Sequence, residues 1–355
     1  MSRILLRNGR IWDGEGFLTG DVLVEQGKIA GIGEKLASEA DLVYDADGRI
    51  ITPGLVDIHM HMRGISVDQW GTPAELSCIP FGVTAACDVS AAQGDRTLLD
   101  TMLVKNRVLL GIPIRQNQPD FAQVEEKKMR YGDKVIGLKV FCDAASSEIE
   151  NTEPLREIVA YAHARQLFVM VHCNGSPIPM AEILKVLGEG DILTHAYHGG
   201  ANSAAEDGFK SLKEAKMRGV VIDAGMAGHV HTDFEVFRQA VELGILPDVI
   251  STDITRASAY HRGGRYGMTM CMSIARSLGM PEEAILKAVT SAAAKAIGME
   301  AQCGSLQVGR SADLAVLSYT GEGFDLTDKA GHRWNSPKGY RCELTMVDGQ
   351  VVYRH

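Results

Sequence analysis

Two histidines separated by one residue close an apolar run near the start of the chain. The run reads Gly54-Leu55-Val56-Asp57-Ile58-His59-Met60-His61. Successive side chains of a β-strand point to opposite faces, so His59 and His61 face the same way and could grip one divalent metal ion. A histidine pair of this kind is more often a hydrogen-bonded pair in the core or at the surface. A metal site therefore requires further ligands elsewhere in the chain.

Four more residues with suitable side chains lie at or near the ends of other apolar runs. Each has an ordinary explanation when taken alone, as a capped core histidine, a turn-forming aspartate or a lysine that reaches for solvent. The four residues are Lys139, His172, His195 and Asp253. Together with His59 and His61 they predict one metal site, because the six residues belong to five separate strand-like runs.

The central part of the chain alternates between strand-like and helix-like segments. Eight strands alternating with helices over about 250 residues fit an α/β fold, the (β/α)8 TIM-type barrel. In such a barrel the catalytic groups lie at the C-terminal ends of the strands, where the six residues fall. The expected strands are 55–61, 83–89, 110–116, 135–141, 167–172, 191–196, 219–224 and 248–254. The expected helices are 96–109, 154–166, 179–188, 203–218, 233–244, 264–279 and 281–298, with a weaker one in 117–134.

Both ends of the chain have a different pattern, with short alternating runs interrupted by glycine. Such runs are typical of antiparallel strands, and neither end has enough of them to bury a sheet face alone. We therefore predict a small β-sandwich domain built from both termini, residues 1–53 and 304–355, beside a metal-binding barrel of residues 54–303. A doubly wound open sheet is the alternative, but no GxGxxG follows the first strand.

The composition is that of a globular protein with a large core. Of the 355 residues, 45% are hydrophobic and 23% are charged, and the net charge is −9. The absence of a basic block argues against nucleic acid or an anionic membrane as partner. The seven cysteines show no CxxC spacing, and no signal-peptide pattern opens the chain. We therefore expect a cytoplasmic protein with reduced thiols.

The chain resembles the amidohydrolase superfamily of metal-dependent hydrolases over nearly its whole length. The resemblance rests first on the order of the six candidate ligands along the chain. It also rests on two segments, Ile51-Thr52-Pro53-Gly54-Leu55-Val56-Asp57-Ile58-His59-Met60-His61 and, where the chain goes back to the terminal domain, Gly304-Ser305-Leu306-Gln307-Val308-Gly309-Arg310. Within the superfamily the chain is most similar to the dihydroorotase-like deacetylase group. The segment 244–253, which ends in Asp253, is much like that group's eighth strand.

The resemblance implies two divalent metal ions, usually Zn²⁺, bridged by a carboxylated Lys139. One ion would be held by His59, His61 and Asp253, and the other by His172 and His195. A hydroxide between the ions would attack an amide or ester carbonyl, with Asp253 as proton shuttle. The carboxylation itself is chemically reasonable, because a buried site disfavours the ammonium form and a neutral amine can add carbon dioxide.

Substrate recognition is expected in the loops that follow the strands. Arg63 forms an HxHxR pattern like that of dihydroorotases, in which the arginine grips a carboxylate. Tyr197 follows the sixth strand, Arg256 the eighth, and a Gly-rich turn after the seventh carries His229 and His231. We favour His229 over His231 for binding the substrate. The expected substrate is a small N-acyl or O-acyl carboxylic acid, and the expected assembly is a homo-oligomer.

Three other functions compete with deacetylation. A cyclic amide hydrolase of the dihydroorotase or dihydropyrimidinase type is the first alternative, although Gly64-Ile65-Ser66-Val67 does not continue the dihydroorotase pattern. A nucleobase deaminase is disfavoured, because the fifth strand ends in His172-Cys173-Asn174-Gly175 without the glutamate of an HxxE pattern. A non-catalytic scaffold is disfavoured because all six ligands are present.

Overall fold

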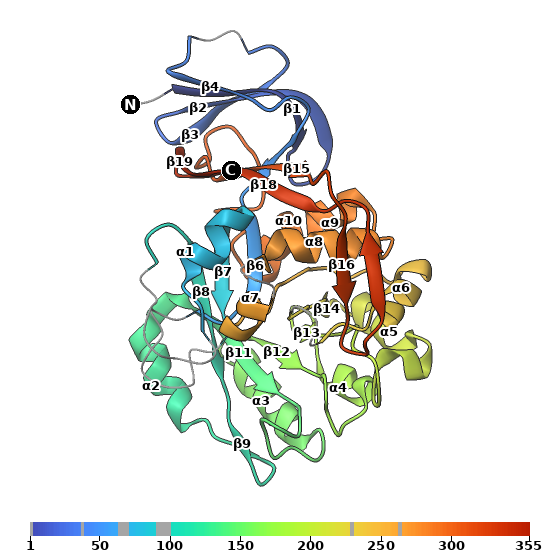
Figure 1. Ribbon diagram of the computed structural model, residues 1–355. Helices are drawn as coiled ribbons and strands as arrows, with labels where there is room; N and C mark the ends of the chain where they lie inside the picture. The colour runs from blue at the N-terminus through green and yellow to red at the C-terminus, as the bar shows by residue number, and fades with distance from the viewer. Residues whose placement is uncertain (1–2, 37–38, 63–70, 90–100, 228–230, 262–264) are drawn as a thin grey trace.

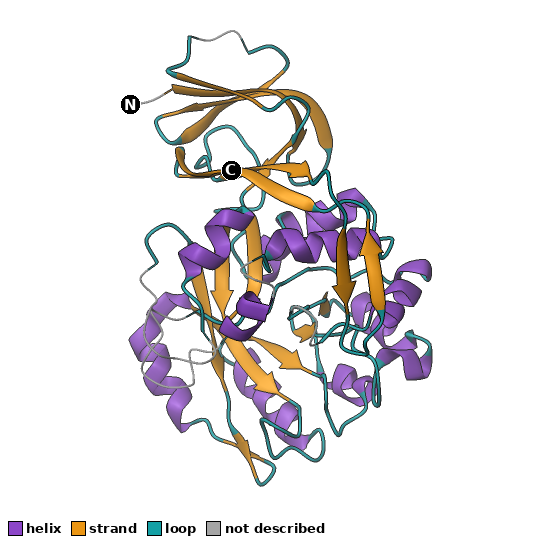
Figure 2. Cartoon of the chain, in the orientation of Figure 1, coloured by secondary structure: helices purple, strands orange, loops and turns teal. Residues whose placement is uncertain are grey.

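A curled sheet of parallel strands forms the centre of the molecule (Figures 1 and 2). The computed structural model describes residues 3–36, 39–62, 71–89, 101–227, 231–261 and 265–355. Over these ranges no helix is both long and apolar enough to cross a bilayer. The strands of the curled sheet are β6 (Leu55–Met60), β7 (Val83–Asp88), β8 (Lys105–Gly111), β11 (Val135–Phe141), β12 (Phe168–His172), β13 (Ile192–Thr194) and β14 (Val221–Asp223).

The segment that precedes and includes Asp253 closes this sheet into a barrel. It pairs in parallel with β14 at Asp223 and Val249, and with β6 at Met60 and Ile254. Between these points the amide of Asp253 donates to the carbonyl of His59 at 2.7 Å. The predicted eighth strand is therefore present as an extended segment that makes isolated β-bridges to the first and seventh strands of the barrel.

Helices surround the barrel, as the alternating pattern predicts. Their apolar faces, such as Leu155, Ile158 and Ala162 of α3, are buried in the same core as the outer strand residues. The helices are α1 (Ala74–Cys78), α2 (Ala122–Tyr131), α3 (Glu153–His163), α4 (Met180–Val186), α5 (Lys210–Met217), α6 (Phe234–Glu242), α7 (Arg256–His261), α8 (Met268–Ser277), α9 (Glu282–Ala288) and α10 (Ser291–Ala296), with 3₁₀ turns at Ile79–Phe81, Gly132–Lys134 and Ala204–Asp207.

The third barrel strand lies earlier in the chain than the sequence pattern predicts. Strand β8 begins at Lys105 and residues 101–104 form an irregular segment with bends rather than a helix, so the helix expected over 96–109 is wrong from Thr101 onward; residues 90–100 lie outside the described part. Pairing with β7 on one side, from Ala85 opposite Lys105, and with β11 on the other fixes this register. Of the remaining residues predicted for the third strand, two form β9 (Ile114–Arg115), which makes a small hairpin with β10 (Gln118–Pro119).

Strands from both termini join in one mixed sheet beside the barrel, as predicted. Strand β15 from the C-terminal part pairs antiparallel with β5 from the N-terminal part, with Leu314 opposite Pro53. The sheet curls around a separate apolar cluster that includes Leu6, Val22 and Leu314. Its strands are β1 (Arg3–Trp12), β2 (Phe17–Glu25), β3 (Lys28–Gly33), β4 (Leu42–Asp45), β5 (Ile50–Pro53), β15 (Leu314–Tyr319), β18 (Tyr340–Val347) and β19 (Gln350–Arg354).

One hairpin leaves this terminal sheet and runs along the flank of the barrel (Figure 1). It consists of β16 (Phe324–Thr327) and β17 (Arg333–Ser336), which pair antiparallel with each other and lie between β15 and β18 in the chain. Leu326 of the hairpin is 1% exposed and belongs to the barrel's own core cluster. The hairpin thus carries its turn, residues 328–332, toward the end of the barrel where the strands terminate.

Candidate metal centre

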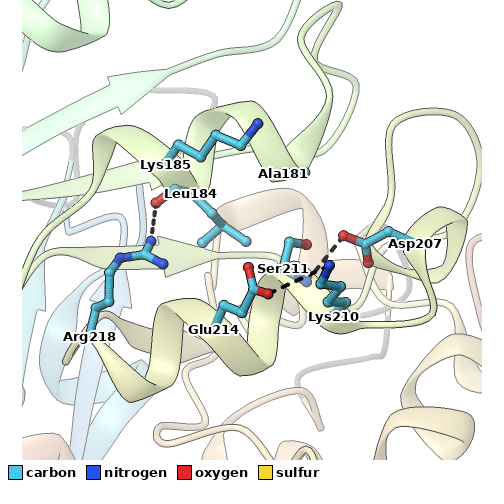
Figure 3. A pocket seen from close by; sticks show the side chains of 8 residues that line it. All are labelled: Ala181, Leu184, Lys185, Asp207, Lys210, Ser211, Glu214 and Arg218. Atoms are coloured by element: carbon cyan, nitrogen blue, oxygen red, sulfur yellow. Dashed lines mark hydrogen bonds and ion pairs between the residues drawn. The ribbon is translucent and has the colours of Figure 1, made fainter.

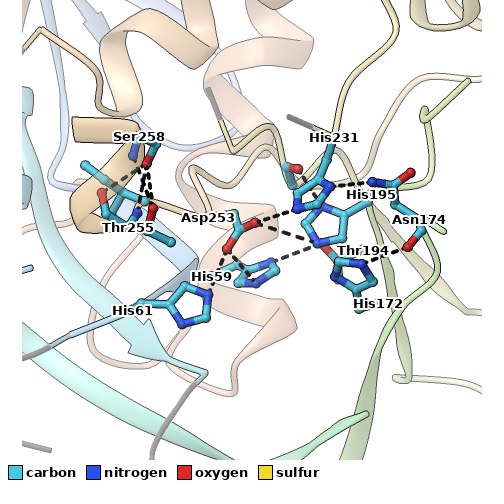
Figure 4. Close-up of polar contacts among 12 residues, drawn as sticks. His59, His61, His172, Asn174, Thr194, His195, His231, Asp253, Thr255 and Ser258 are labelled. Carbon is cyan, nitrogen blue, oxygen red and sulfur yellow. Dashed lines mark hydrogen bonds and ion pairs between the residues drawn. The ribbon is translucent and has the colours of Figure 1, made fainter. Parts of the chain in front are cut away.

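The register of the barrel brings the ends of its later strands to one level. Phe141, His172, Thr194 and Asp223 are successive partners across β11, β12, β13 and β14. His172 ends its strand and His195 follows the last residue of β13, while Lys139 lies two residues before the end of β11. The predicted ligands therefore meet at the C-terminal rim of the barrel (Figure 4).

The first group of candidate ligands consists of His59, His61 and Asp253. One ligand atom from each lies within 4.8 Å of the others. The Nε2 atoms of His61 and His59 are 2.9 Å and 3.2 Å from Oδ1 of Asp253. The two imidazole centres are 5.9 Å apart, as the alternation argument requires for side chains on one face.

The second group contains His172, His195 and His231. Ligand atoms of these three residues also lie within 4.8 Å of one another. The sequence had favoured His229 over His231 as a substrate-binding residue. The ring centre of His231 is 4.0 Å from that of His195 and 5.0 Å from that of His172. The sequence does indicate His231, because it is the second histidine in the turn after the seventh strand. The preference for His229 left it out of the predicted site.

Lys139 and Asp253 lie between the two groups. Lys139 is completely buried, and its Nζ is 3.2 Å from Nε2 of His59. Burial lowers the pKa of Lys139 to about 8, against the opposing effect of the Asp253 and Asp223 carboxylates. The second oxygen of Asp253 faces His195 at 3.8 Å and His231 at 3.5 Å.

Hydrogen bonds to oxygen atoms determine which ring nitrogen carries a proton in His59, His172 and His195. A carbonyl can only accept, so His195 donates from Nδ1 to Gly225 at 2.6 Å and His172 donates from Nε2 to Asn174 at 3.0 Å. The Thr194 hydroxyl donates to Asp223 at 2.7 Å and therefore accepts from Nδ1 of His59 at 3.0 Å. The lone pairs of His59 and His195 are thereby held on Nε2, and that of His172 on Nδ1.

These lone pairs fit a divalent cation. Nε2 of His195 is buried and has no hydrogen-bond partner among the described residues. Burial, together with the neighbouring His231, lowers the pKa of both His172 and His195 well below the usual value. Neutral imidazoles with a fixed tautomer, next to a carboxylate, are the donors that Zn²⁺ takes in proteins.

The carboxylate of Asp253 is ionised near neutral pH. Burial alone would raise its pKa, but His59 and the hydrogen bond from His61 bring the pKa below its usual value. An ionised carboxylate in contact with two imidazoles can hold a cation or accept a proton.

Two of the candidate ligands have strained backbone conformations. His195 has φ of 64° and Asp253 has φ of 47°, both in the left-handed region that residues other than glycine rarely adopt. The left-handed turn at His195 ends β13 at Thr194, two residues before the predicted end. Strain of this kind costs about 1–3 kcal/mol per residue and gathers at functional sites.

The predicted substrate-binding residues have different outcomes. Arg63 and His229 lie outside the described residues. Tyr197 is fully buried, donates to the carbonyl of Ile245 at 3.1 Å and packs on Phe237, which argues against the predicted pocket role because its hydroxyl is used in the core. Arg256 is exposed at the start of α7, after the closing segment.

A separate hollow lies on the outer surface between α4 and α5 (Figure 3). Its polar groups are engaged with one another: Arg218 donates to the carbonyl of Leu184 at 2.6 Å, and Lys210 lies 3.8 Å from Glu214. None of the candidate ligands lines this hollow, so it does not compete with the barrel rim as a catalytic site.

Known proteins resemble the chain along nearly its whole length. The model of the amidohydrolase family matches residues 50–352. A deacetylase of Agrobacterium fabrum is 27% identical over 337 residues, covering 88% of this chain and 81% of the relative. A dihydroorotase of Anaeromyxobacter dehalogenans is 25% identical over 440 residues, covering 99% of this chain and 98% of the relative.

The fold comparison agrees with the sequence comparison. The crystal structure of a dihydroorotase superposes with a TM-score of 0.86 at 23% identity, covering 100% of this chain and 98% of that one. The family match spans most of the chain and includes the barrel whose rim carries the two histidine-containing groups described above. The chain therefore belongs to the amidohydrolase family of metal-dependent hydrolases.

Proposed function

We propose that this chain is a deacetylase that hydrolyses the amide or ester bond of a small N-acyl or O-acyl carboxylic acid. The observation that carries the proposal is the pair of ligand groups at the barrel rim, which share Asp253 and enclose Lys139. The choice of deacetylation follows the likeness to the Agrobacterium fabrum deacetylase. A cyclic amide hydrolase is the second candidate, because a dihydroorotase is among the relatives.

In this proposal two divalent ions, Zn²⁺, would be held by the side chains of the rim. His59, His61 and Asp253 would bind one ion, and His172 and His195 the other. Lys139 would join them as a carbamate, since its buried amine can lose a proton and add carbon dioxide. When bound, the ions would polarise the acyl carbonyl and lower the pKa of a water to about 7.

The chain's own residues then manage orientation and protons. Asp253 lies between both ligand groups, so its carboxylate can take a proton from the attacking water and pass it to the leaving nitrogen or oxygen. One water is consumed, the acyl–heteroatom bond breaks, and an acid and an amine or alcohol are released. Thr194 and Gly225 hold His59 and His195 in the orientation and tautomer that leave their Nε2 atoms facing the centre.

A substrate panel tests the proposal. The panel contains N-acetyl amino acids and O-acetyl hydroxy acids of both chiralities, together with dihydroorotate, each assayed before and after removal of metal by a chelator. We expect hydrolysis of one acyl class, lost on chelation and restored by Zn²⁺. Hydrolysis of dihydroorotate alone would favour the second candidate, and hydrolysis that persists without metal would overturn the metal-dependent mechanism.

Asp47→Asn provides a matched control for site variants in these assays. Asp47 is exposed and has φ of 49°, close to the backbone angle of Asp253. Asparagine tolerates this left-handed conformation, so the control reproduces the chemical change at a remote position without new strain.

A further inference from the structure

The turn of the β16–β17 hairpin docks on the chain that follows His231. The carboxylate of Asp328 in the turn accepts a hydrogen bond from the amide of Phe234 at 2.9 Å. The same carboxylate accepts from Nδ1 of His332 at 2.8 Å, across the turn. The amide of Lys329 donates to the carbonyl of Thr232 at 3.4 Å. The hairpin is therefore bound to the barrel rim within three residues of His231.

This docking brings the ammonium of Lys329 onto the side chain of Asn174. Lys329 Nζ lies 2.7 Å from Oδ1 of Asn174 and 3.4 Å from the carbonyl of Gly199. An ammonium has three donors and no acceptor, so only the oxygen of the Asn174 amide can face it. The orientation of that amide is therefore fixed by Lys329, with its NH₂ group on the opposite side.

The NH₂ group of Asn174 in turn faces His231. Nδ2 of Asn174 lies 2.6 Å from Nδ1 of His231 (Figure 4). Since Nδ2 can only donate, Nδ1 of His231 accepts, and the ring proton sits on Nε2. Nε2 points toward Oδ2 of Asp253 at 3.5 Å.

These contacts separate His231 from the other two histidines of its group. A metal ligand needs a lone pair directed at the ion. His195 and His172 each keep such a lone pair, because a backbone carbonyl takes their ring proton. In His231 the lone pair is used by Asn174, and the nitrogen that faces the site carries hydrogen.

We propose that His231 is a hydrogen-bond donor to the acyl oxygen of the substrate and that Lys329, acting through Asn174, is the residue that positions it. Nε2 of His231 lies beside Asp253, which in the proposed function takes the proton of the water that attacks the acyl carbonyl. The assignment of the acyl oxygen as the acceptor therefore rests on the proposed function. A donor fixed in advance where negative charge develops stabilises the transition state without reorganisation. His231 is then a catalytic residue, and Lys329 and Asn174 are positioning residues outside the ligand set.

The first test concerns the ring itself and does not depend on activity. Nitrogen-15 spectra of histidine-labelled protein, with the His231 signal assigned by its loss in His231→Gln, should show Nε2 protonated and Nδ1 bare. In Lys329→Met the Asn174 amide can turn over, and the population protonated at Nδ1 should rise. A wild-type ring protonated at Nδ1, or a spectrum unchanged in Lys329→Met, would overturn the positioning role.

Metal content separates a donor from a ligand. We expect His231→Ala to retain the wild-type number of bound Zn²⁺ ions per chain, whereas His195→Ala should lose metal. If His231→Ala loses as much metal as His195→Ala, His231 is a ligand and the proposal fails. This readout also stands if the chain proves to hydrolyse something other than an acyl acid.

Kinetics test the link from Lys329 to catalysis. With the best substrate of the panel, Lys329→Met should lower kcat by about tenfold with little change in KM, as expected for loss of part of a transition-state contact. Lys329→Arg also offers only donors to Asn174 and should recover most of kcat. Lys338→Met, an exposed lysine in the loop after β17, is the matched control. Equal losses in the methionine and arginine variants, or none in the methionine variant, would contradict the proposal.

Discussion

The protons on the site histidines are distributed by oxygen atoms one contact away from the centre. Gly225 and Asn174 contribute backbone carbonyls, and Thr194 contributes a hydroxyl whose own proton is committed to Asp223. Asp223 also accepts from Ser251 at 2.7 Å, so this buried carboxylate organises two neighbours at once. The chemistry of His59 thus depends on residues that no short motif contains.

Removing the hydroxyl of Thr194 tests this dependence. Thr194→Val keeps the shape of the side chain but leaves Nδ1 of His59 without its acceptor. We expect zinc affinity to fall by about 10–100-fold, as for other partners of metal-bound histidines. Competition with a chromogenic chelator measures the affinity, and Thr194→Ser, which keeps the hydroxyl, is the control. Equal affinities in the valine and serine variants would show that the hydroxyl does not orient His59.

Asp253 provides the proton-transfer test at the residue scale. Asp253→Asn removes the base but keeps the shape and tolerates the left-handed backbone. We expect kcat to fall by about 100-fold or more while circular dichroism stays at the wild-type level. Asp47→Asn, made in parallel, should retain full turnover. An Asp253→Asn enzyme with wild-type turnover would remove this residue from proton transfer.

At the scale of elements, sequence patterning predicted most of the barrel but not its irregular parts. Strands such as β6, β7 and β11 are continuous apolar runs, because helices or core cover both faces, and they were located to within one residue. Strand β8 was displaced because residues 101–109 have the composition of a helix, and pairing with β7 and β11 overrides that preference.

The left-handed residues explain another part of the difference. A period-two pattern continues through His195 and Asp253, but their φ angles break the strand at the residues that face the site. Histidine and aspartate adopt positive φ more often than most residues other than glycine, but only a small fraction of them do so, and residue type therefore does not locate these two breaks. The contact between Lys329 and Asn174 was equally invisible, since it joins residues 155 positions apart in the chain.

The turn of the β16–β17 hairpin makes a pH-dependent contribution to stability. The hydrogen bond and charge of Asp328 raise the pKa of His332 above its ordinary value. Because the pKa of His332 is raised in the folded state, the pair stabilises the fold fully below about pH 6.5, the pKa of histidine in the unfolded chain. This stabilisation is lost as the pH rises through the pKa of the folded state.

Replacement of His332 should reveal this dependence. We expect His332→Gln to lower the melting temperature by about 1 °C near pH 6 and by less near pH 9. The measurement is a series of thermal melts of wild type and variant in matched buffers. His163→Gln, at a histidine in α3 for which Asp191 is the partner, is the comparison. A difference that stays constant between these two pH values would mean that the His332 charge does not stabilise the turn.

In the molecule as a whole, the β16–β17 hairpin connects the terminal sheet to the end of the barrel that carries the site. Strand β5 runs directly into β6, so the sheet lies at the end of the barrel where that strand begins (Figure 1). The β16–β17 hairpin then runs along the barrel flank and places Lys329 at the opposite rim (Figure 1). The C-terminal part of the chain therefore contributes to both the sheet and the catalytic end.

We expect the rim side chains to bind two metal ions together. Zinc analysis of protein purified after expression with zinc supplied tests it most directly, with Lys139→Met as a variant that keeps the volume but cannot form a carbamate. We expect about two ions per wild-type chain and a clear loss in the variant. Fewer than about 0.3 ions per wild-type chain, with the fold intact, would contradict it, because a two-metal site requires occupancy by both ions.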